Sequence, residues 1–280
     1  MELTAADRHQ RAVAFADLHR GPGAFVIPNP WDAGTARLLA GLGFAALATT
    51  SGGLAHRMGR RDGARRVGRD DTLHNVREVA EATGLPVSAD LENGFGDAPE
   101  DVVHTVRAAA QAGAAGGSIE DATGRDGDPI YGFDHAVERI AAAAEAAREL
   151  PVPFTLTARA ENFLHGRPDL DDTIRRLRAF EQAGADVLYA PALPDAESIR
   201  AVCAAVTKPV NVLAVGAARE LSVAGLAELG VRRVSLGSTL SRAALSAVVH
   251  AARQIVDFGT FPDSTGVLTG AEIDGALGNA

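Results

Sequence analysis

Short apolar runs alternate along the chain with longer segments in which apolar residues recur every three or four positions. The short runs are typical of buried strands and the longer segments of amphipathic helices, an order that indicates parallel strands joined by helical crossovers. The expected strands lie at residues 24–27, 45–50, 87–91, 117–120, 154–158, 187–190, 210–213 and 234–236. The expected helices lie at residues 32–42, 72–83, 99–112, 134–150, 171–183, 196–205, 222–229 and 239–258.

These cycles predict a (β/α)₈ TIM barrel of the α/β class. Several helices end in a glycine-containing phrase, at residues 40–43, 111–114, 182–185 and 228–231, and glycine there takes the left-handed conformation that turns the chain toward the next strand. No linker interrupts the repeats, whereas a doubly wound open sheet more often has about five or six strands. We expect one catalytic barrel over residues 1–258 and a C-terminal extension over 259–280. This tail, with a short helix at 269–277, either packs on a partner subunit, caps the barrel or frays.

Composition and charge narrow the classes of partner. The 280 residues carry a formal net charge of −9, with 46% hydrophobic and 22% charged residues. A polyphosphate partner needs a positive field, so nucleic-acid binding is not expected. No apolar run reaches the length of a membrane-spanning helix and no signal segment opens the sequence. We expect a cytoplasmic protein that binds a small molecule and contacts neither nucleic acid nor membrane.

Cysteine and lysine each occur only once, which argues against the chemistry that depends on them. Cys203, the only cysteine, lies in a segment with helical spacing and is typical of a packed hydrophobe, and a single cysteine excludes a disulfide within the chain. Lys208, the only lysine, stands at the start of an apolar strand, the end of a barrel strand that ordinarily carries no chemistry. A Schiff-base mechanism is therefore not expected.

The carboxyl ends of the expected strands are rich in acids and amides. Active sites of such barrels lie at this end. The polar and glycine positions there are Asn29, Trp31, Asp32, Ser51, Gly52, Gly53, Asp90, Glu92, Asn93, Glu120, Asp121, Arg159, Glu161, Asn162 and Asn211. Crowded carboxylates repel one another unless a cation or protons neutralise them. Oxygen ligands at this density suit Mg²⁺, with Mn²⁺ as the alternative.

Asp90 and Glu92 are the strongest metal candidates in this set. They end an apolar strand two residues apart, so they project in the same direction if the strand alternation persists. The Gly-Phe-Gly turn at 94–96 lets a substrate approach the backbone closely. The alternative is that a strand-end acid only caps the helix that follows it.

Five motifs at matching strand ends resemble the isocitrate lyase and phosphoenolpyruvate mutase superfamily. They are Asn-Pro-Trp-Asp-Ala at 29–33, Thr-Ser-Gly-Gly at 50–53, Ser-Ala-Asp-Leu-Glu-Asn-Gly-Phe-Gly at 88–96, Ser-Ile-Glu-Asp at 118–121 and Thr-Ala-Arg-Ala-Glu at 157–161. The resemblance extends over roughly residues 10–258. It implies a magnesium-dependent enzyme that handles a 2-oxo acid through an enolate. It also implies a homo-oligomer, a dimer or tetramer, in which a C-terminal helix is exchanged between subunits.

The resemblance further implies roles for individual residues. The matching acids of the metal shell are Asp90, Glu92 and Glu120. The matching substrate-binding positions are the pocket-floor residues Trp31 and Asp32, the backbone cradle Ser51, Gly52 and Gly53, and Arg159, and we add the rim amide Asn211. The expected catalytic residues are the loop acid Asp62, which contacts substrate or water, together with Glu120 and Arg159.

One loop departs from the family pattern. Isocitrate and methylisocitrate lyases carry a signature with lysine and cysteine after strand four, and the corresponding loop at 122–132 has neither residue. A true isocitrate lyase is therefore not expected. We expect a lyase, decarboxylase or hydrolase that cleaves a C–C bond of an oxaloacetate-like or 3-substituted 2-oxo acid through a metal-stabilised enolate. The loop is glycine-rich and charged, as lids are.

Three other functions remain open. The first is a C–P bond mutase or hydrolase of the phosphonopyruvate type. The second is a phosphosugar enzyme, because Gly216 and the Gly-Ser-Thr run at 237–239 occupy places where many barrels bind phosphate. The third is a metabolite-binding barrel without turnover. His56 and His165, on loops after strands two and five, are candidate proton donors.

Overall fold

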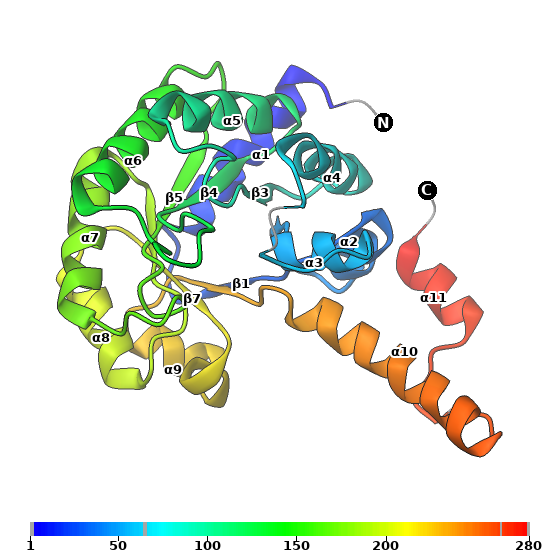
Figure 1. Ribbon diagram of the computed structural model, residues 1–280. Coiled ribbons are helices and arrows are strands. Elements are labelled where there is room, and N and C mark those ends of the chain that lie inside the picture. The colour runs from blue at the N-terminus through cyan, green and yellow to red at the C-terminus, as the bar shows by residue number, and fades with distance from the viewer. Residues whose placement is uncertain (1–2, 64–65, 264, 279–280) are drawn as a thin grey trace.

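Eight parallel strands form a barrel surrounded by helices, as the sequence predicts (Figure 1). The computed structural model describes residues 3–63, 66–263 and 265–278. The strands are β1 (Phe25–Ile27), β2 (Leu47–Ala48), β3 (Val87–Asp90), β4 (Gly116–Glu120), β5 (Thr155–Arg159), β6 (Val187–Tyr189), β7 (Val210–Leu213) and β8 (Arg233–Ser235). They pair in the order β1-β8-β7-β6-β5-β4-β3-β2.

The side chain of Asn29 bridges the place where the strand ladder is open, between β1 and β2. The Ala48 N–H donates to the Pro28 carbonyl at 3.0 Å across this gap. Asn29 Nδ2 donates to the Thr49 carbonyl at 2.9 Å, and Asn29 Oδ1 accepts from the Leu236 N–H at 2.9 Å. One amide from the end of β1 therefore ties the ends of β2 and β8 together at the rim.

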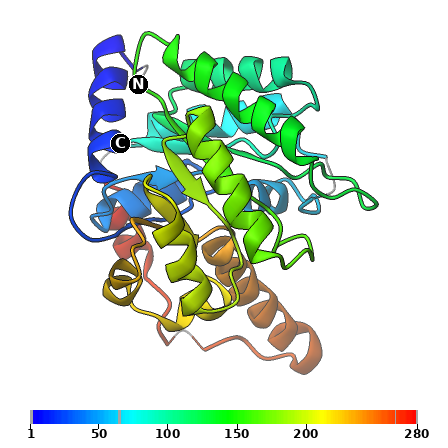
Figure 2. The same cartoon turned by 90° about the vertical axis from the view of Figure 1, so that its left-hand side faces the viewer.

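Helices follow the strands along the chain, and most of them carry an apolar face inward. They are α1 (Ala5–Leu18), α2 (Ala33–Gly41), α3 (Ser51–Arg57), α4 (Arg69–Ala82), α5 (Pro99–Gln111), α6 (Phe133–Arg148), α7 (Leu170–Ala183), α8 (Ala196–Ala205), α9 (Val223–Glu228), α10 (Thr239–Phe258) and α11 (Gly270–Leu277), with a 3₁₀ turn η1 (Gly216–Glu220). Figure 2 shows the side of the barrel on which α6, α7 and α8 cover the strands. The predicted tail helix is confirmed as α11.

Two helices, α1 and α3, lie where the sequence analysis expected none. In α1 only Ala12 and Phe15 are buried, so its apolar pattern is too sparse to be recognised by spacing. A Cβ on Gly116, the first residue of β4, would lie 2.9 Å from the Phe15 ring. The helix α1 therefore covers the amino-terminal opening of the barrel, and the opposite, carboxyl end is left for the site.

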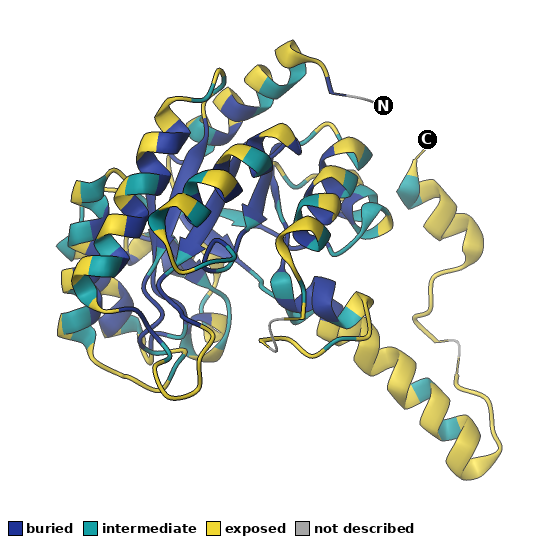
Figure 3. Ribbon diagram, turned by 45° about the horizontal axis from the view of Figure 1, so that its top comes forward, coloured by how far each residue is buried: buried dark blue, intermediate teal, exposed yellow. Residues whose placement is uncertain are grey.

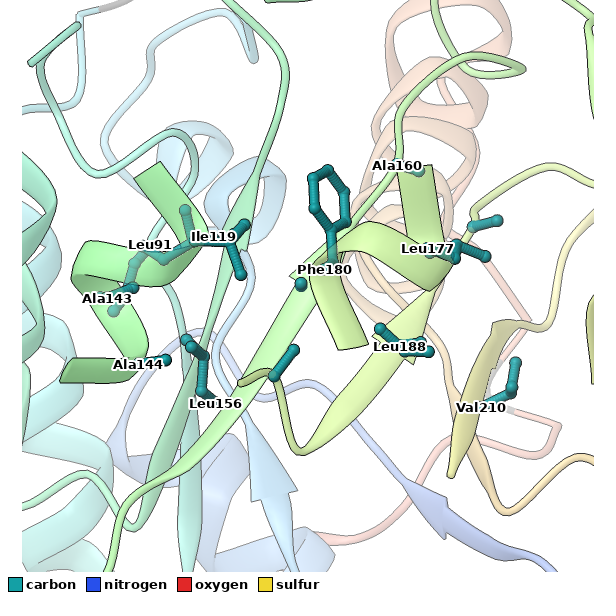
Figure 4. Packing of buried hydrophobic residues seen from close by; sticks show 14 of the residues in the cluster. Leu91, Ile119, Ala143, Ala144, Leu156, Ala160, Leu177, Phe180, Leu188 and Val210 are labelled. Atoms are coloured by element: carbon teal, nitrogen blue, oxygen red, sulfur yellow. The ribbon is translucent and has the colours of Figure 1, made fainter. Parts of the chain in front are cut away.

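The main core lies between the strands and the surrounding helices. Figure 4 shows Leu177 and Phe180 of α7 near Leu156 and Leu188 of the neighbouring strands. All four are fully buried. The helix α6 contributes mainly alanines to this layer, such as Ala143 and Ala144, which allow helix and sheet to approach closely. The strands are thereby fixed from outside, so the interior of the barrel does not need to be filled with apolar side chains.

The helix α10 projects away from the barrel, and the chain then returns to place α11 beside α2 (Figure 1). Only Ser241 is buried in the 20 residues of α10, and Figure 3 shows this helix and the following segment almost entirely exposed. A Cβ on Gly41 of α2 would lie 2.9 Å from the Ala276 carbonyl of α11. The division of the chain at residue 258 stays a prediction.

Candidate active site at the rim of the barrel

A cavity of about 420 Å³ opens at the carboxyl ends of the strands and continues into the barrel. Cavities of this size hold small metabolites. Six of the residues that were given a catalytic, substrate-binding or metal-binding role from the sequence line it, namely Ser51, Gly52, Asp62, Asp90, Arg159 and Asn211. The strand ends therefore converge as expected. About half of the site residues predicted from the sequence line one cavity.

Arg159, the last residue of β5, is the centre of the rim. Its Nη1 lies 3.2 Å from Asp90 Oδ1, its Nη2 lies 3.2 Å from Glu120 Oε2, and its Nε lies 2.8 Å from Glu161 Oε1. The guanidinium also lies over the Tyr189 ring, 5.0 Å from its centroid. One planar fork thus joins acids from the ends of β3, β4 and β5, a set of contacts that a single ammonium group could not make.

The charges around Arg159 do not balance. Burial raises the pKa of Glu120 well above its usual range, Arg159 opposes this rise, and Glu161, Asp90 and Glu92 add to it. Burial by itself would lower the pKa of Arg159, but the neighbouring acids raise it well above its usual range. One oxygen of Glu161, Oε2, is buried without a hydrogen-bond partner among the described residues. The cluster therefore holds more negative charge than one arginine neutralises.

The predicted cradle of Ser51, Gly52 and Gly53 forms the first turn of α3. Thr50 caps this helix, with the Gly53 N–H donating to Thr50 Oγ1 at 3.3 Å. The Ser51 N–H donates to Asp90 Oδ2 at 2.9 Å. A Cβ on Gly52 would lie 2.7 Å from Asp62 Oδ2, and a Cβ on Gly53 would lie 2.6 Å from Thr50 Cγ2. A side chain at either position would therefore displace a neighbour, at Gly52 the end of the exposed Asp62 side chain and at Gly53 the Thr50 methyl group that belongs to the cap.

Glu92 does not follow the strand alternation expected of it. The strand β3 ends at Asp90, and Glu92 takes a φ of 47° in a turn where the Gly94 N–H donates to the Leu91 carbonyl at 2.8 Å. The strand alternation that would make Asp90 and Glu92 point in the same direction therefore does not extend to Glu92. Glu92 instead lines a small recess together with Ser51 and Asp62, next to the main cavity. It stays close enough to Glu120 to raise the pKa of that carboxyl.

Trp31 and Asp32 are not among the residues that line the cavity. Asp32 caps α2, with its Oδ1 accepting from the Thr35 N–H at 2.7 Å. The Trp31 carbonyl accepts from Asn75 Nδ2 at 2.9 Å, and a Cβ on Gly53 would lie 3.2 Å from Trp31 Cβ. In this structure both residues fix the packing of α2 and α3 behind the cradle.

The loop at 122–132 is tied to the turn after β3. Its ends form an antiparallel bridge between Ala122 and Ile130. The Tyr131 hydroxyl, buried, donates to Asp97 Oδ1 at 2.6 Å, and Arg125 Nη1 lies 2.8 Å from Asp97 Oδ2. Neither Tyr131 nor Arg125 is among the residues that line the cavity.

Several cavity residues were missed by the sequence analysis. Tyr189 of β6 and Arg233 of β8 line the cavity, as do Ser88, Ser118 and Ser235 on the strands and Arg242 of α10. Polar residues inside expected strands, at positions that alternate with apolar ones, were the available signal. Tyr189 in particular interrupts an apolar run, whereas Arg233 follows Arg232 and stands just before the strand expected at 234–236.

A family model for phosphoenolpyruvate phosphomutase matches residues 15–256 of the chain. The chain belongs to this family. It is thereby a member of the isocitrate lyase and phosphoenolpyruvate mutase superfamily, and the resemblance inferred from the five motifs is confirmed.

Related sequences and solved structures match most of this chain. An uncharacterised Mycobacterium tuberculosis protein is 33% identical over 257 residues, 90% of this chain and 92% of that protein. A Corynebacterium glutamicum protein named probable 2-methylisocitrate lyase 2 is 32% identical over 201 residues, 69% of this chain and 64% of that protein. A solved structure from Burkholderia cenocepacia J2315, provisionally assigned as a lyase or mutase, is 56% identical with a TM-score of 0.94 and covers 98% of both chains. The structure of 2,3-dimethylmalate lyase is 26% identical with a TM-score of 0.83, over 96% of this chain and 94% of that one.

The acids of the rim suit a hydrated magnesium ion. Among the described residues no group of three or more histidine, cysteine, aspartate or glutamate side chains is arranged to hold a metal ion by itself. Mg²⁺ is usually bound through one or two carboxylates and keeps several waters, so a closed cage is not required. The excess of buried carboxylate over cation fits an added dication, as does Glu161 Oε2, which accepts no hydrogen bond and has only His165 Nε2 at 4.0 Å among the described residues. The residues present therefore fit the metal that the superfamily implies.

None of the helices in the described parts of the chain is both long enough and apolar enough to cross a bilayer.

Proposed function

We propose that the protein is a magnesium-dependent enzyme that cleaves a C–C bond of a small 2-oxo acid through an enolate, as a lyase, decarboxylase or hydrolase. The single observation that carries this proposal is Arg159, held by acids from three strands at the mouth of an open cavity. A 2-oxo acid offers adjacent keto and carboxylate oxygens, which match a cation on one side and an arginine fork on the other. Relatives named as 2-methylisocitrate lyase and 2,3-dimethylmalate lyase support C–C cleavage.

Each rim residue has a role in this proposal. Asp90, Glu92 and Glu120 would hold the Mg²⁺ ion. When bound, it would act as a Lewis acid on the keto oxygen and lower the cost of the enolate. A guanidinium carries five N–H groups, so Arg159 has two beyond its contacts to the three acids, and these would donate to the carboxylate of the oxo acid. The first turn of α3 adds the Ser51 N–H, which donates to Asp90 in this structure and lies at the edge of the cavity.

Asp62 is the candidate for handling protons and water at the mouth. It is exposed, it lines the cavity, and its carboxylate packs against Gly52. An exposed carboxylate at the mouth can orient water or exchange a proton with solvent. The loop at 122–132 offers no cysteine for this task, which agrees with an enzyme that is not an isocitrate lyase.

Substrate turnover tests the proposal directly. The protein is incubated with Mg²⁺ and, separately, oxaloacetate, 2-methylisocitrate, 2,3-dimethylmalate or phosphonopyruvate. The release of pyruvate or a related oxo acid is followed, and for hydrolysis of oxaloacetate the release of oxalate and acetate. We expect metal-dependent release from at least one of the C–C substrates, and its loss when a chelator is added, because the enolate needs the dication. Free Mg²⁺ also chelates oxaloacetate, so the rate without protein is subtracted.

Other outcomes separate the alternatives. If phosphonopyruvate were the only compound turned over, the proposed reaction would be cleavage or rearrangement of a C–P bond and not of a C–C bond. Turnover that persists at full rate in chelator would remove the metal from the mechanism. Saturable binding of oxo acids with no product from any of them would favour a metabolite-binding barrel, and turnover of phosphosugars would favour the phosphate-binding alternative.

We also propose that a second copy of this chain covers the apolar face of α10. Leu245, Val248 and Val249 are exposed on this helix, and Val256 and Phe258 are 82% and 76% exposed. An isolated helix with an uncovered apolar stripe is marginal in water, and contiguous apolar surface of this kind marks an interface. Helical spacing places Leu245, Val248, Val249 and Val256 along one side of the helix, whereas Phe258, its last residue, lies off this stripe. A homo-oligomer, dimer or tetramer, would supply the missing cover.

Light scattering coupled to size exclusion measures the assembly. We expect the native protein to elute with at least twice the mass of one chain. We expect the double variant Val248→Glu, Val256→Glu to shift toward the monomer, because charges would be buried in the interface. The control is Val223→Glu, which changes an exposed valine on a different helix, α9. A native monomer at micromolar concentration would contradict the proposal.

A further inference from the structure

Many of the strand side chains that line the cavity inside the barrel are small or polar. They include Ala48, Ser88, Ser118, Asn211 and Ser235, together with the larger apolar Ile27 and Leu213. Barrel interiors are usually filled by bulky branched residues such as valine, isoleucine and leucine. Here small side chains leave space, and the cavity continues inward as far as Arg233.

Arg233 is a buried arginine at the wall of this cavity. It is the first residue of β8 and only 4% exposed. Arg159, Tyr189, Asn211 and Arg233 are successive partners in the strand register of β5 to β8, so they line one continuous row of the barrel wall. The cation is therefore part of the same cavity as the rim site.

The partners of Arg233 are all neutral. Its Nε donates to Asn211 Oδ1 at 2.8 Å and its Nη2 donates to Thr157 Oγ1 at 3.0 Å. Its Nη1 lies 3.4 Å from His19 Nε2. His19 Nδ1 lies 2.8 Å from the Phe15 carbonyl, which can only accept, so Nδ1 carries the hydrogen and Nε2 presents a lone pair. Burial, aided by Arg233, lowers the pKa of His19 to about 3, so the imidazole is uncharged.

No carboxylate of the described residues lies within ion-pair distance of Arg233, in contrast to Arg159 with its three acids. Burial, together with repulsion from Arg159, lowers the pKa of Arg233 to about 10, so it remains charged at neutral pH. A buried charge without a counter-charge is costly. An uncompensated cation at the wall of a ligand cavity indicates an anionic ligand group as its missing partner.

We propose that Arg233 binds a second acidic group of the substrate, so that the preferred 2-oxo acid carries an additional carboxylate or phosphonate beyond the one that Arg159 binds. This inference rests on the proposed function, in which Arg159 binds the carboxylate next to the keto group. Two neutral donors on the same wall complete the subsite: Ser235, and Tyr189, whose hydroxyl keeps its hydrogen because burial raises the pKa of Tyr189 to about 12. The distal charge thereby decides which oxo acids bind well.

Titration calorimetry with a matched pair of ligands tests this assignment. 2-Oxoglutarate and 2-oxopentanoate have the same number of carbons and differ only in the distal acid, and 2-oxo-4-phosphonobutanoate replaces that acid by a phosphonate. We expect the native protein with Mg²⁺ to bind one of the doubly acidic ligands about 10- to 100-fold more tightly than 2-oxopentanoate, the range expected for one charge-assisted contact. Which of the two binds more tightly identifies the distal group.

Arg233→Met should abolish this preference while leaving the affinity for 2-oxopentanoate within about threefold, because only the distal contact is removed. The control is Arg232→Met, the adjacent arginine, whose Nη1 donates to the Gly21 and Gly23 carbonyls at 2.8 and 2.7 Å. It should keep the preference. Equal affinity of the native protein for all three ligands would overturn the assignment, whether or not the variant folds. An equal loss for both kinds of ligand in a folded Arg233→Met protein would assign Arg233 to the frame of the barrel and also overturn it.

Ligands without the keto group keep this test separate from the proposed function. If the native protein binds no 2-oxo acid, the proposed function fails. A preference for glutarate over pentanoate that disappears in Arg233→Met would then still support the anion site, and the absence of such a preference would overturn it.

Discussion

Asp90→Asn is expected to lower kcat/KM by about a thousandfold and to weaken the dependence of the rate on Mg²⁺, the size of effect that follows loss of one group that stabilises an oxyanion through a metal. Asp90 contacts both the first turn of α3 and the end of β5. Its Oδ2 accepts from the Ser51 N–H at 2.9 Å, and its Oδ1 lies 3.2 Å from Arg159 Nη1. The asparagine is nearly the same size, so the cavity keeps its shape while the metal loses a charged ligand.

Steady-state rates measured over a range of Mg²⁺ concentrations check this expectation. The matched control is Asp171→Asn, which removes an exposed acid in the first turn of α7 and should change kcat/KM by less than about twofold. Circular dichroism establishes that both variants fold. An Asp90→Asn enzyme with native kcat/KM and native Mg²⁺ response would show that Asp90 is not a metal ligand.

Arg159→Met is expected to remove measurable turnover and to destabilise the fold by about 3–5 kcal/mol, the range found when one partner of a buried ion pair is deleted. Its side chain is 13% exposed, and it joins Asp90, Glu120 and Glu161, whose exposures are 15%, 16% and 1%. Without the guanidinium these carboxylates face one another with no cation between them in the metal-free protein. Arg159→Lys should not restore turnover, because an ammonium group cannot form the planar fork.

The destabilisation should grow with pH. The pKa of Glu120 in the folded protein is raised above its unfolded value, so the folded state keeps a proton that the unfolded state releases. Stability is then highest below the unfolded pKa and falls as pH rises from there toward the folded pKa. The charge of Arg159 lowers the pKa of Glu120, so removing Arg159 raises that pKa further and makes the fall in stability larger. Urea unfolding without metal should therefore show a greater difference between native and Arg159→Met proteins at pH 8 than at pH 5.

Arg175→Met is the control for Arg159. Arg175 lies on α7 with its side chain 59% exposed and pairs with Asp172 at 2.7 Å on the surface, so its loss should cost less than about 1 kcal/mol at either pH. If Arg159→Met unfolds at the same urea concentration as the native protein at both pH values, Arg159 does not hold the acids of the rim together.

The strand ends were predictable because parallel strands joined by helices bring their carboxyl ends to one rim. Asp90, Glu120 and Arg159 could be placed together from that rule alone, and the structure joins them by contacts of 3.2 Å. The position of Glu92 could not be predicted, because a φ of 47° two residues after the strand ends depends on the turn that packs there. The roles of Trp31 and Asp32 were also not evident from spacing, since a capping acid and a pocket acid look alike in sequence.

The sequence by itself determined the (β/α)₈ architecture, the superfamily and the set of acids at the rim, because these follow from local periodicity and from motifs whose spacing is visible along the chain. Only the tertiary structure showed that Arg233, at the start of β8, shares a cavity with Arg159, at the end of β5. The strands of a barrel are staggered, so residues at opposite ends of different strands become neighbours in register. Stagger is set by how the whole sheet closes, and no single segment of the sequence encodes it.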